Sequence, residues 1–591
     1  MARGIARWEG PPRAATATEA CAGCHAHRRE IVADPAPGAP FLGAYTPALL
    51  EPELYQPDGA ILGEVFEWGS FQQSAMHRAG VTRTDCHEPH SARLRAAGNA
   101  LCLQCHAAER FEAAAHHRHA AGSAGAQCTA CHLATRTYMG VHRQHDHAFR
   151  VPRPDVSAVL GTSDACTDCH ADHDAPWAAA GIAEWHGEAR RREPHWGSAL
   201  AAGRAGAPGA AAQLLALAGD CNAPCLARAT ALSLLGGLPP ARGSPATRGA
   251  AALGVASRDP DPLVHLGAAT AAATLPPADR AAILASLVAD PLRAVRLEAA
   301  RALAPVLDAA LPPEHRAAWA LAMAEYQVAA RHNADQPEAL GSLGDVLAEQ
   351  GRAGEAEARY RAALRLDAGF VPARTGLSEL LRRTGREREA EAVLREGIAQ
   401  DVVPGAAALH HSLGLSLVRQ RRGAEALEAL AEAARLGPSD ARFAFVHAVA
   451  LDGAGRPREA SEAVRAALLR HPGNRDILLM LASIARDGRC TGHRPCLCAA
   501  GPGRPSGRPG RVGAPPVAIG RAIGRLVTPR PSMVAKSRTC RKQIAFRDHP
   551  KPRQTYDPPR QAGTPVPDAV LPRSHRCRPL LFGLMTSLPP D

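Results

Sequence analysis

Aromatic residues are scarce in this chain of 591 residues: Phe, Trp and Tyr together account for 4%, while Ala, Arg, Gly and Pro are abundant. Long apolar runs are also missing, and a membrane-spanning helix needs about 20 consecutive, mostly apolar residues. We therefore expect no transmembrane segment. The length predicts several domains rather than one.

Lysine is absent from the first 535 residues, and the net charge of +12 originates at the end of the chain. Residues 488–591 hold 19 of the 69 Lys and Arg residues but only 4 of the 57 acidic residues, with no Glu among them. The preceding residues keep 50 basic and 53 acidic side chains and are nearly neutral. A nucleic-acid-binding function would depend on the tail alone, so we expect no nucleic-acid partner.

Cysteine and histidine are concentrated together near the N-terminus. Nine of the 16 Cys residues lie before residue 170, and 17 of the 27 His residues lie before residue 196. The sequence Cys-x-x-Cys-His occurs four times in this part of the chain. The four copies comprise Cys21, Cys24 and His25; Cys102, Cys105 and His106; Cys128, Cys131 and His132; and Cys166, Cys169 and His170.

This spacing is the attachment sequence of haem c. The two thiols form thioethers with the porphyrin vinyl groups, and the adjacent His binds the iron from the proximal side. Cys-x-x-Cys also binds zinc, but zinc sites seldom require His directly after the second Cys in every copy. Four copies therefore predict a multihaem domain with covalently attached haem c.

A fifth, incomplete copy lies between the first and second motifs. Cys86 and His87 match the second Cys and the His, but Arg83 stands where the first Cys is expected. Cys86 has the thiol for a single thioether, with His87 as proximal ligand. A chance Cys-His pair is the alternative, and the residues alone leave both open.

In low-spin electron-transfer haems a second His usually completes the coordination of the iron. Such distal ligands are harder to identify from the sequence than the proximal ones. We regard His77, His90 and His147 as the best candidates, and we expect one of His116, His117 and His119 to bind iron as well. Before residue 196, the other His residues outside the motifs are His27, His142, His145, His173, His186 and His195.

The whole chain is predicted to be mainly α-helical, but residues 1–195 are loop-rich and carry the haem motifs. We expect no ordinary apolar core there, because the haems would supply the apolar bulk, and we expect one clear helix over residues 64–77. Residues 196–312 become rich in Ala and Leu. Two segments that begin at Asp259 and Asp290 resemble HEAT repeats, with a generic helical linker as the alternative.

A period of about 34 residues occupies residues 313–487. A small residue followed four positions later by a large apolar residue recurs at intervals of 34, 34, 36 and 34 residues. The pairs are Ala322 and Tyr326, Ala356 and Tyr360, Ala390 and Leu394, Ala426 and Leu430, and Ala460 and Val464. This pattern predicts tetratricopeptide repeats (TPRs), in which small residues lie where paired helices touch.

The period ends inside its last repeat. Residues 477–487 read as a first helix, but residues 488–591 are rich in Pro, Arg and Gly and continue no repeat. We expect this tail to be disordered, either as the product of a frameshift near codon 487 or as a genuine basic tail that binds an anionic partner.

Several stretches carry a family resemblance: residues 63–71, 80–90, 98–106, 135–140, 146–155 and 163–170. The chain resembles, over about residues 15–487, the multihaem cytochromes c with a tetratricopeptide tail that are related to the cytochrome c-554/nitrite-reductase-like group. The resemblance implies a Cys where Arg83 stands and further motifs before Cys21. It therefore implies an N-terminally truncated haem domain.

Haem c is attached outside the cytoplasm, so we expect a periplasmic or other extracytoplasmic location. Residues 1–10 contain charges but no apolar signal segment, and we expect that Met1 is not the true start. The leading hypothesis is an electron-transfer protein whose helical repeats dock a redox partner protein. A multihaem reductase or oxidase of a small nitrogen or sulfur compound is the second, and a repeat scaffold with an inert haem domain is the third.

Overall fold

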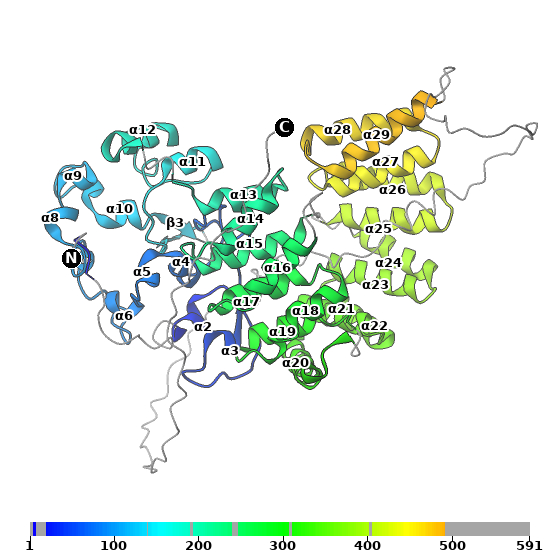
Figure 1. Cartoon of the computed structure of the whole chain (residues 1–591), viewed down its shortest axis with the longest axis horizontal. Helices are drawn as coiled ribbons and strands as arrows, with labels where there is room; N and C mark the ends of the chain where they lie inside the picture. The colour runs from blue at the N-terminus through cyan, green and yellow to red at the C-terminus, as the bar shows by residue number, and fades with distance from the viewer. Residues whose placement is uncertain are drawn as a thin grey trace, which may run out of the picture. The chain divides into compact units, whose positions relative to one another are not determined.

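The computed structural model is mainly α-helical, as predicted, and helices follow one another along nearly all of the described chain (Figure 1). It describes residues 4–6, 19–138, 140–188, 193–238, 246–306, 310–400 and 405–490. The predicted disorder of the tail falls, from residue 491 onward, outside the described residues. None of the described helices is long and apolar enough to cross a bilayer.

Short elements separated by loops make up the part before residue 195, as predicted. Its helices are α2 (Ala22–His25), α3 (Phe41–Ala44), α4 (Glu67–Gln73), α5 (Ala75–Arg78), α6 (Arg83–Cys86), α7 (Ala100–Leu103), α8 (Ala108–Phe111), α9 (Ala114–His117), α10 (Cys128–His132), α11 (Pro154–Leu160) and α12 (Ala175–His186), with a 3-10 turn at Ala124–Ala126. Two antiparallel hairpins pair β1 (Arg28–Glu30) with β2 (Tyr45–Pro47) and β3 (Thr135–Tyr138) with β4 (His142–His145).

The single helix predicted over residues 64–77 is two helices, α4 and α5. They are divided at Ser74, whose backbone is extended, with φ −72° and ψ 148°. The Ser74 hydroxyl accepts a hydrogen bond from the His77 N–H over 2.9 Å and so caps α5. The extended backbone at Ser74 separates α5 from α4, and α5 ends at Arg78.

The expectation that residues 1–195 lack an ordinary apolar core is wrong for their first third. Phe41, Leu50 and Trp68 are buried in the same hydrophobic core as the Ala- and Leu-rich helices that follow residue 196. The Arg204 guanidinium fastens the two parts by donating to the Leu50 carbonyl over 2.7 Å and to the Tyr55 carbonyl over 3.0 Å.

The expectation holds for the stretch that carries the incomplete motif and the next two motifs. Within residues 72–132, Ala126 is the sole buried hydrophobic side chain. We call this stretch the coreless segment. Its structure depends on short turns and hydrogen bonds, because little apolar area is removed from water.

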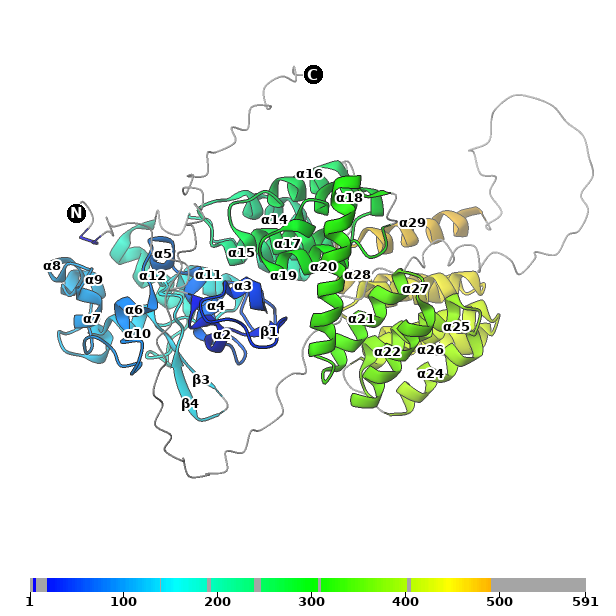
Figure 2. The ribbon, with the colours of Figure 1, turned by 90° about the horizontal axis from the view of Figure 1, so that it is seen from below.

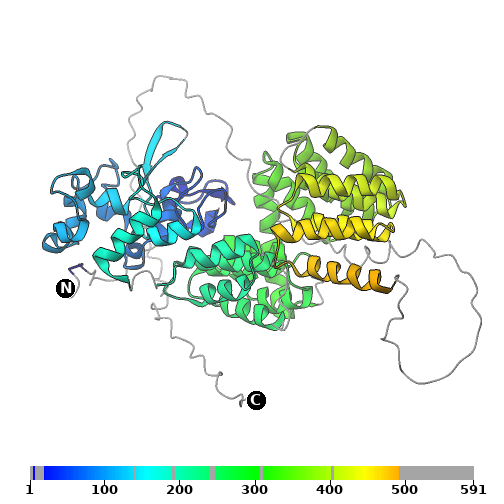
Figure 3. The ribbon, with the colours of Figure 1, turned by 90° about the horizontal axis from the view of Figure 1, so that it is seen from above.

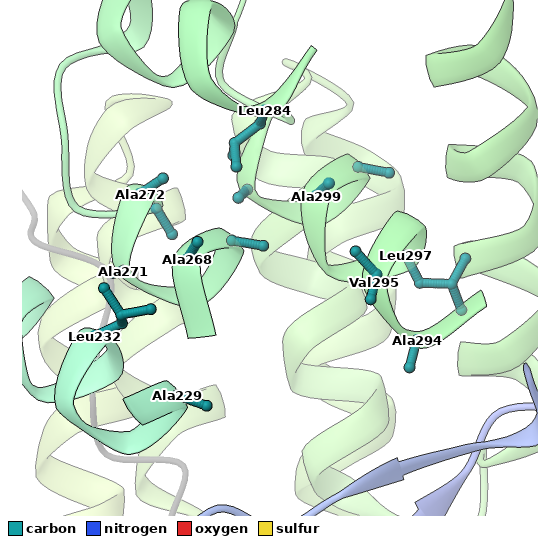
Figure 4. Close-up of a cluster of buried hydrophobic side chains, with 14 of the residues drawn as sticks. Ala229, Leu232, Ala268, Ala271, Ala272, Leu284, Ala294, Val295, Leu297 and Ala299 are labelled. Carbon is teal, nitrogen blue, oxygen red and sulfur yellow. The ribbon is translucent and has the colours of Figure 1, made fainter. Parts of the chain in front are cut away.

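The region predicted to resemble HEAT repeats is a succession of short helices. They are α13 (Trp196–Ala205), α14 (Ala210–Gly219), α15 (Cys225–Gly237), α16 (Ala246–Ala256), α17 (Pro262–Ala272), α18 (Pro277–Leu284) and α19 (Arg293–Ala302), with a 3-10 turn at Leu287–Ala289. Small side chains bring α15, α17 and α19 close together around an apolar core (Figure 4). A Cβ at Gly267 of α17 would lie 2.6 Å from the Ala229 carbonyl oxygen of α15. The HEAT assignment itself stays a prediction.

Longer helices stack in pairs after residue 313 (Figure 2). They are α20 (Pro313–His332), α21 (Pro337–Glu349), α22 (Ala353–Leu366), α23 (Val371–Arg383), α24 (Glu387–Ala399), α25 (Ala406–Arg419), α26 (Gly423–Leu436), α27 (Ala441–Gly453), α28 (Pro457–Arg470) and α29 (Arg475–Cys490). Every Ala and large apolar residue of the 34-residue pattern is buried, which confirms the predicted repeat. Helix α29, orange in Figure 3, lies beside α28 and is the first helix expected after the last full repeat.

Candidate haem-binding sites

Each complete motif folds as one tight turn that brings its His back toward its first Cys. The His25 N–H donates to the Cys21 carbonyl over 2.9 Å, and equivalent bonds join His106 to Cys102 (3.0 Å) and His170 to Cys166 (2.9 Å). The remaining copy forms the short helix α10, Cys128–His132. This turn joins the first Cys and the His of a motif through the backbone, and haem attachment uses the two thiols and the imidazole of such a motif.

The incomplete motif folds in the same way despite its missing cysteine. The His87 N–H donates to the Arg83 carbonyl over 2.8 Å, so Arg83 takes the backbone position of the first Cys. Thr82 and Asp85 form a reciprocal capping box at the start of α6. One Nη2 atom of Arg83 is buried without a hydrogen-bond partner.

Three of the five predicted proximal His residues have their Nδ1 atom held by an oxygen. The acceptors are Glu67 Oε2 for His25 (2.9 Å), the Ala92 carbonyl for His87 (3.1 Å) and the Arg150 carbonyl for His132 (2.6 Å). Since carbonyl and carboxylate oxygens only accept, Nδ1 carries the proton and the Nε2 lone pair is left for a metal. His106 packs edge-on against Phe111 instead, and His170 contacts Trp177.

The predicted distal candidates differ in their surroundings. His147 donates from Nδ1 to the His145 carbonyl over 2.9 Å, which again leaves Nε2 available. His77 packs edge-on against Phe71, and burial lowers the pKa of both His77 and His147. His90 lies in an exposed loop, where its backbone N–H donates to Glu88.

Two other His residues have the opposite arrangement. Nδ1 of His195 accepts from the Gly197 N–H over 3.0 Å, and burial lowers the pKa of His195 to about 4. Nδ1 of His117 accepts from the His119 N–H, while its Nε2 contacts the Glu112 carbonyl. Because Nδ1 accepts in both residues, a neutral imidazole carries its proton on Nε2, which is then not available to iron.

Buried polar atoms without partners lie near the first motif. Trp68 Nε1, Ser70 Oγ and Tyr138 OH are all buried and have no hydrogen-bond partner. Burial of such a group without a partner is costly, which makes orphaned polar atoms rare in a complete structure. A haem has both the apolar face that the coreless segment lacks and polar carboxylates that such donors bind, so the residues present fit it.

The second and third motifs meet at their first cysteines. A hydrogen bond with Cys102 lowers the pKa of Cys128 to about 7. Burial raises the pKa of Cys86, with smaller contributions from Asp85 and Cys105. Burial also raises the pKa of Cys131, with a smaller contribution from Cys169. No group of three or more His, Cys, Asp and Glu side chains in the described ranges is arranged to hold a bare metal ion.

Asn99 joins the second motif to the third and was missed by sequence reasoning. It precedes α7, its Oδ1 accepts from the Cys128 N–H over 2.9 Å, and its Nδ2 donates to the Ala126 carbonyl over 3.0 Å. Glu67 was missed too. Burial acts to raise the pKa of Glu67, but hydrogen bonds from His25 and from its own backbone N–H outweigh burial, so the net pKa is lowered. No spacing rule marks either residue.

Two family models match parts of the chain. A model described as a doubled CXXCH motif matches residues 79–111, which include Cys86-His87 and the complete copy at Cys102–His106. A tetratricopeptide repeat model matches residues 347–413. The chain therefore carries a motif for covalent c-type haem binding and repeats of a class that suggests protein–protein interaction. No curated protein matches the chain.

Solved structures similar to this chain include TPR proteins. YrrB, a TPR protein with an unusual peptide-binding site, is 20% identical over 28% of this chain and 85% of its own, with a TM-score of 0.23. TTC0263, a thermophilic TPR protein from Thermus thermophilus, is 22% identical over 29% and 92%, with a TM-score of 0.24. PilF from Pseudomonas aeruginosa is 20% identical over 33% and 86%, with a TM-score of 0.26.

Proposed function

We propose that this protein is an extracytoplasmic electron carrier that binds five c-type haems covalently and uses its helical repeats to dock a redox partner protein. The observation that supports it most is the shared turn at all five motifs. Three of the five proximal imidazoles are also held with Nε2 available. An electron carrier needs ligands that are oriented before the haem binds. These hydrogen bonds orient the imidazoles.

Each site has its own set of residues. The two cysteines of each complete motif would hold one haem through two thioethers, while Cys86 would hold a haem through one. His25, His87, His106, His132 and His170 would be the proximal ligands, and His147 and His77 would be the favoured distal ligands. Haem iron, when bound, supplies a one-electron couple whose potential depends on axial ligands, nearby hydrogen bonds and burial.

Asn99 and the short turns fix the spacing of neighbouring sites. Asn99 hydrogen-bonds to the backbone at the start of the third motif while it begins the helix of the second. The repeats after residue 313 supply a separate surface for the partner, since repeat helices present extended faces.

Absorption and electron paramagnetic resonance (EPR) spectra of the chain, expressed behind a periplasmic export signal, test this function. Entirely low-spin haem that is reduced and reoxidised reversibly is the expected result. A high-spin fraction that reacts with nitrite, hydroxylamine or sulfite would instead support a reductase. Exported protein without haem would leave the repeat scaffold as the remaining function.

A further inference from the structure

The hydrogen bonds to the proximal His residues are chemically unequal. His87 and His132 donate to neutral backbone carbonyls, those of Ala92 and Arg150. His25 donates from Nδ1 to the side-chain carboxylate of Glu67 over 2.9 Å. The three sites therefore differ in the charge that stands behind the imidazole.

Helix α4 holds Glu67 firmly in this place. Glu67 is the first residue of α4, and the next residues, Trp68, Ser70 and Phe71, are all buried. The Glu67 side chain is 21% exposed, so water screens it only in part. His147 and Tyr138 are the other titratable groups whose electrostatic interaction with Glu67 is appreciable.

A carboxylate behind a ligating imidazole changes the electron-donating strength of that imidazole. It draws the Nδ1 proton toward itself, because hydrogen bonds to an ionised acceptor are about twice as strong as neutral ones. The imidazole becomes a more basic ligand. A more basic ligand and a nearby negative charge both stabilise Fe(III) relative to Fe(II), which lowers the reduction potential.

The His87 site has a neutral acceptor in the same place. Its imidazole donates from Nδ1 to the Ala92 carbonyl over 3.1 Å. The His25 and His87 sites therefore differ in the charge of the acceptor behind the imidazole.

We propose that Glu67 is a positioning residue that acts through His25 to give the first haem site a lower reduction potential than the His87 and His132 sites. This inference rests on the proposed haem binding. It predicts that electrons pass from the His25 site toward the His87 and His132 sites, because they move toward higher potential.

Potentiometric titration of the exported holoprotein and its Glu67→Gln variant tests the proposal. Gln keeps the shape of Glu and an oxygen that accepts from Nδ1, but it removes the charge. At a fixed applied potential, the Fe(III)/Fe(II) ratio of one component should fall about tenfold. For a one-electron couple, this equals an upward shift of about 59 mV. The low-spin EPR signal of one haem should change with it, while the other components stay unchanged.

Glu64→Gln is the matched control, because Glu64 is an exposed carboxylate three residues earlier in the same segment. It should leave all components in place, and Glu67→Asp should retain the low potential. Unchanged components in Glu67→Gln, or an equal shift in Glu64→Gln, would overturn the role of Glu67. The pyridine haemochrome count separates this from a failure of haem binding, since haem-free protein would overturn both proposals.

Discussion

The coreless segment and the tetratricopeptide repeats are ordered by different means. In the repeats, Ala356, Tyr360 and Leu394 are nearly inaccessible to solvent, and side chains of successive helices fill one another's gaps. In residues 72–132, hydrogen-bonded turns are present but almost no apolar side chain is buried. The difference indicates that the repeats fold on side-chain packing, and it predicts that the coreless segment depends on the proposed haems for stability.

Loss of the proposed haems should affect the longest stretch of the chain in this comparison. Replacing Cys102, Cys105, Cys128 and Cys131 by Ser prevents two attachments. Amide hydrogen exchange in residues 98–132 should then accelerate by roughly 100-fold, because this segment opens locally more often when no haem packs against it. Helices α21–α28 should keep their protection. Unchanged exchange in residues 98–132 would show that this segment folds without haem.

Truncation of Tyr360 tests the other side of the comparison. Its ring fills the space beside Gly344, where a Cβ would lie 2.7 Å from Tyr360 Cε1, and its hydroxyl donates to Asp345 over 2.7 Å. Tyr360→Ala should destabilise the repeats by about 4 kcal/mol. Tyr360→Phe retains the ring and should cost only about 1–2 kcal/mol. Chemical denaturation followed by far-ultraviolet circular dichroism measures both, and the haem spectrum should not change.

Removal of the Asn99 side chain should have an intermediate effect, confined to the coreless segment. Asn99→Ala leaves the Cys128 N–H and the Ala126 carbonyl without their partner, which should cost about 1–2 kcal/mol of local stability. Asn99→Asp keeps the acceptor for Cys128 and should lose less. Hydrogen exchange of residues 124–132 is the readout. Equal exchange in both variants would refute the role of Asn99 in joining the second and third motifs.

The smallest expected effect concerns the pH dependence of the helices between the two regions. Burial acts to lower the pKa of His265, but its hydrogen bond to Asp290 over 3.0 Å outweighs burial, so the pKa is raised above 6.5. A raised pKa stabilises the folded state below pH 6.5, and this stability is lost as pH rises through the folded pKa. Thermal melting should show the loss in the parent chain and not in His265→Gln.

The sequence predicted the repeats well because their packing is periodic. The 34-residue pattern located the buried Ala and apolar positions from Ala322 to Val464. The haem motifs were equally visible, because attachment chemistry fixes their spacing. Glu67 and Asn99 escaped prediction, since their roles depend on contacts 42 and 29 residues away that no local pattern encodes. The division of the helix at Ser74 was missed because its apolar spacing continues across the break.

The haem content of the exported chain tests the central claim most directly. Pyridine haemochrome analysis combined with intact mass should give five haems per chain, and Cys86→Ser should give four. Four haems in both proteins would contradict attachment at Cys86, and a count near zero would contradict the cofactor-dependent account of the coreless segment.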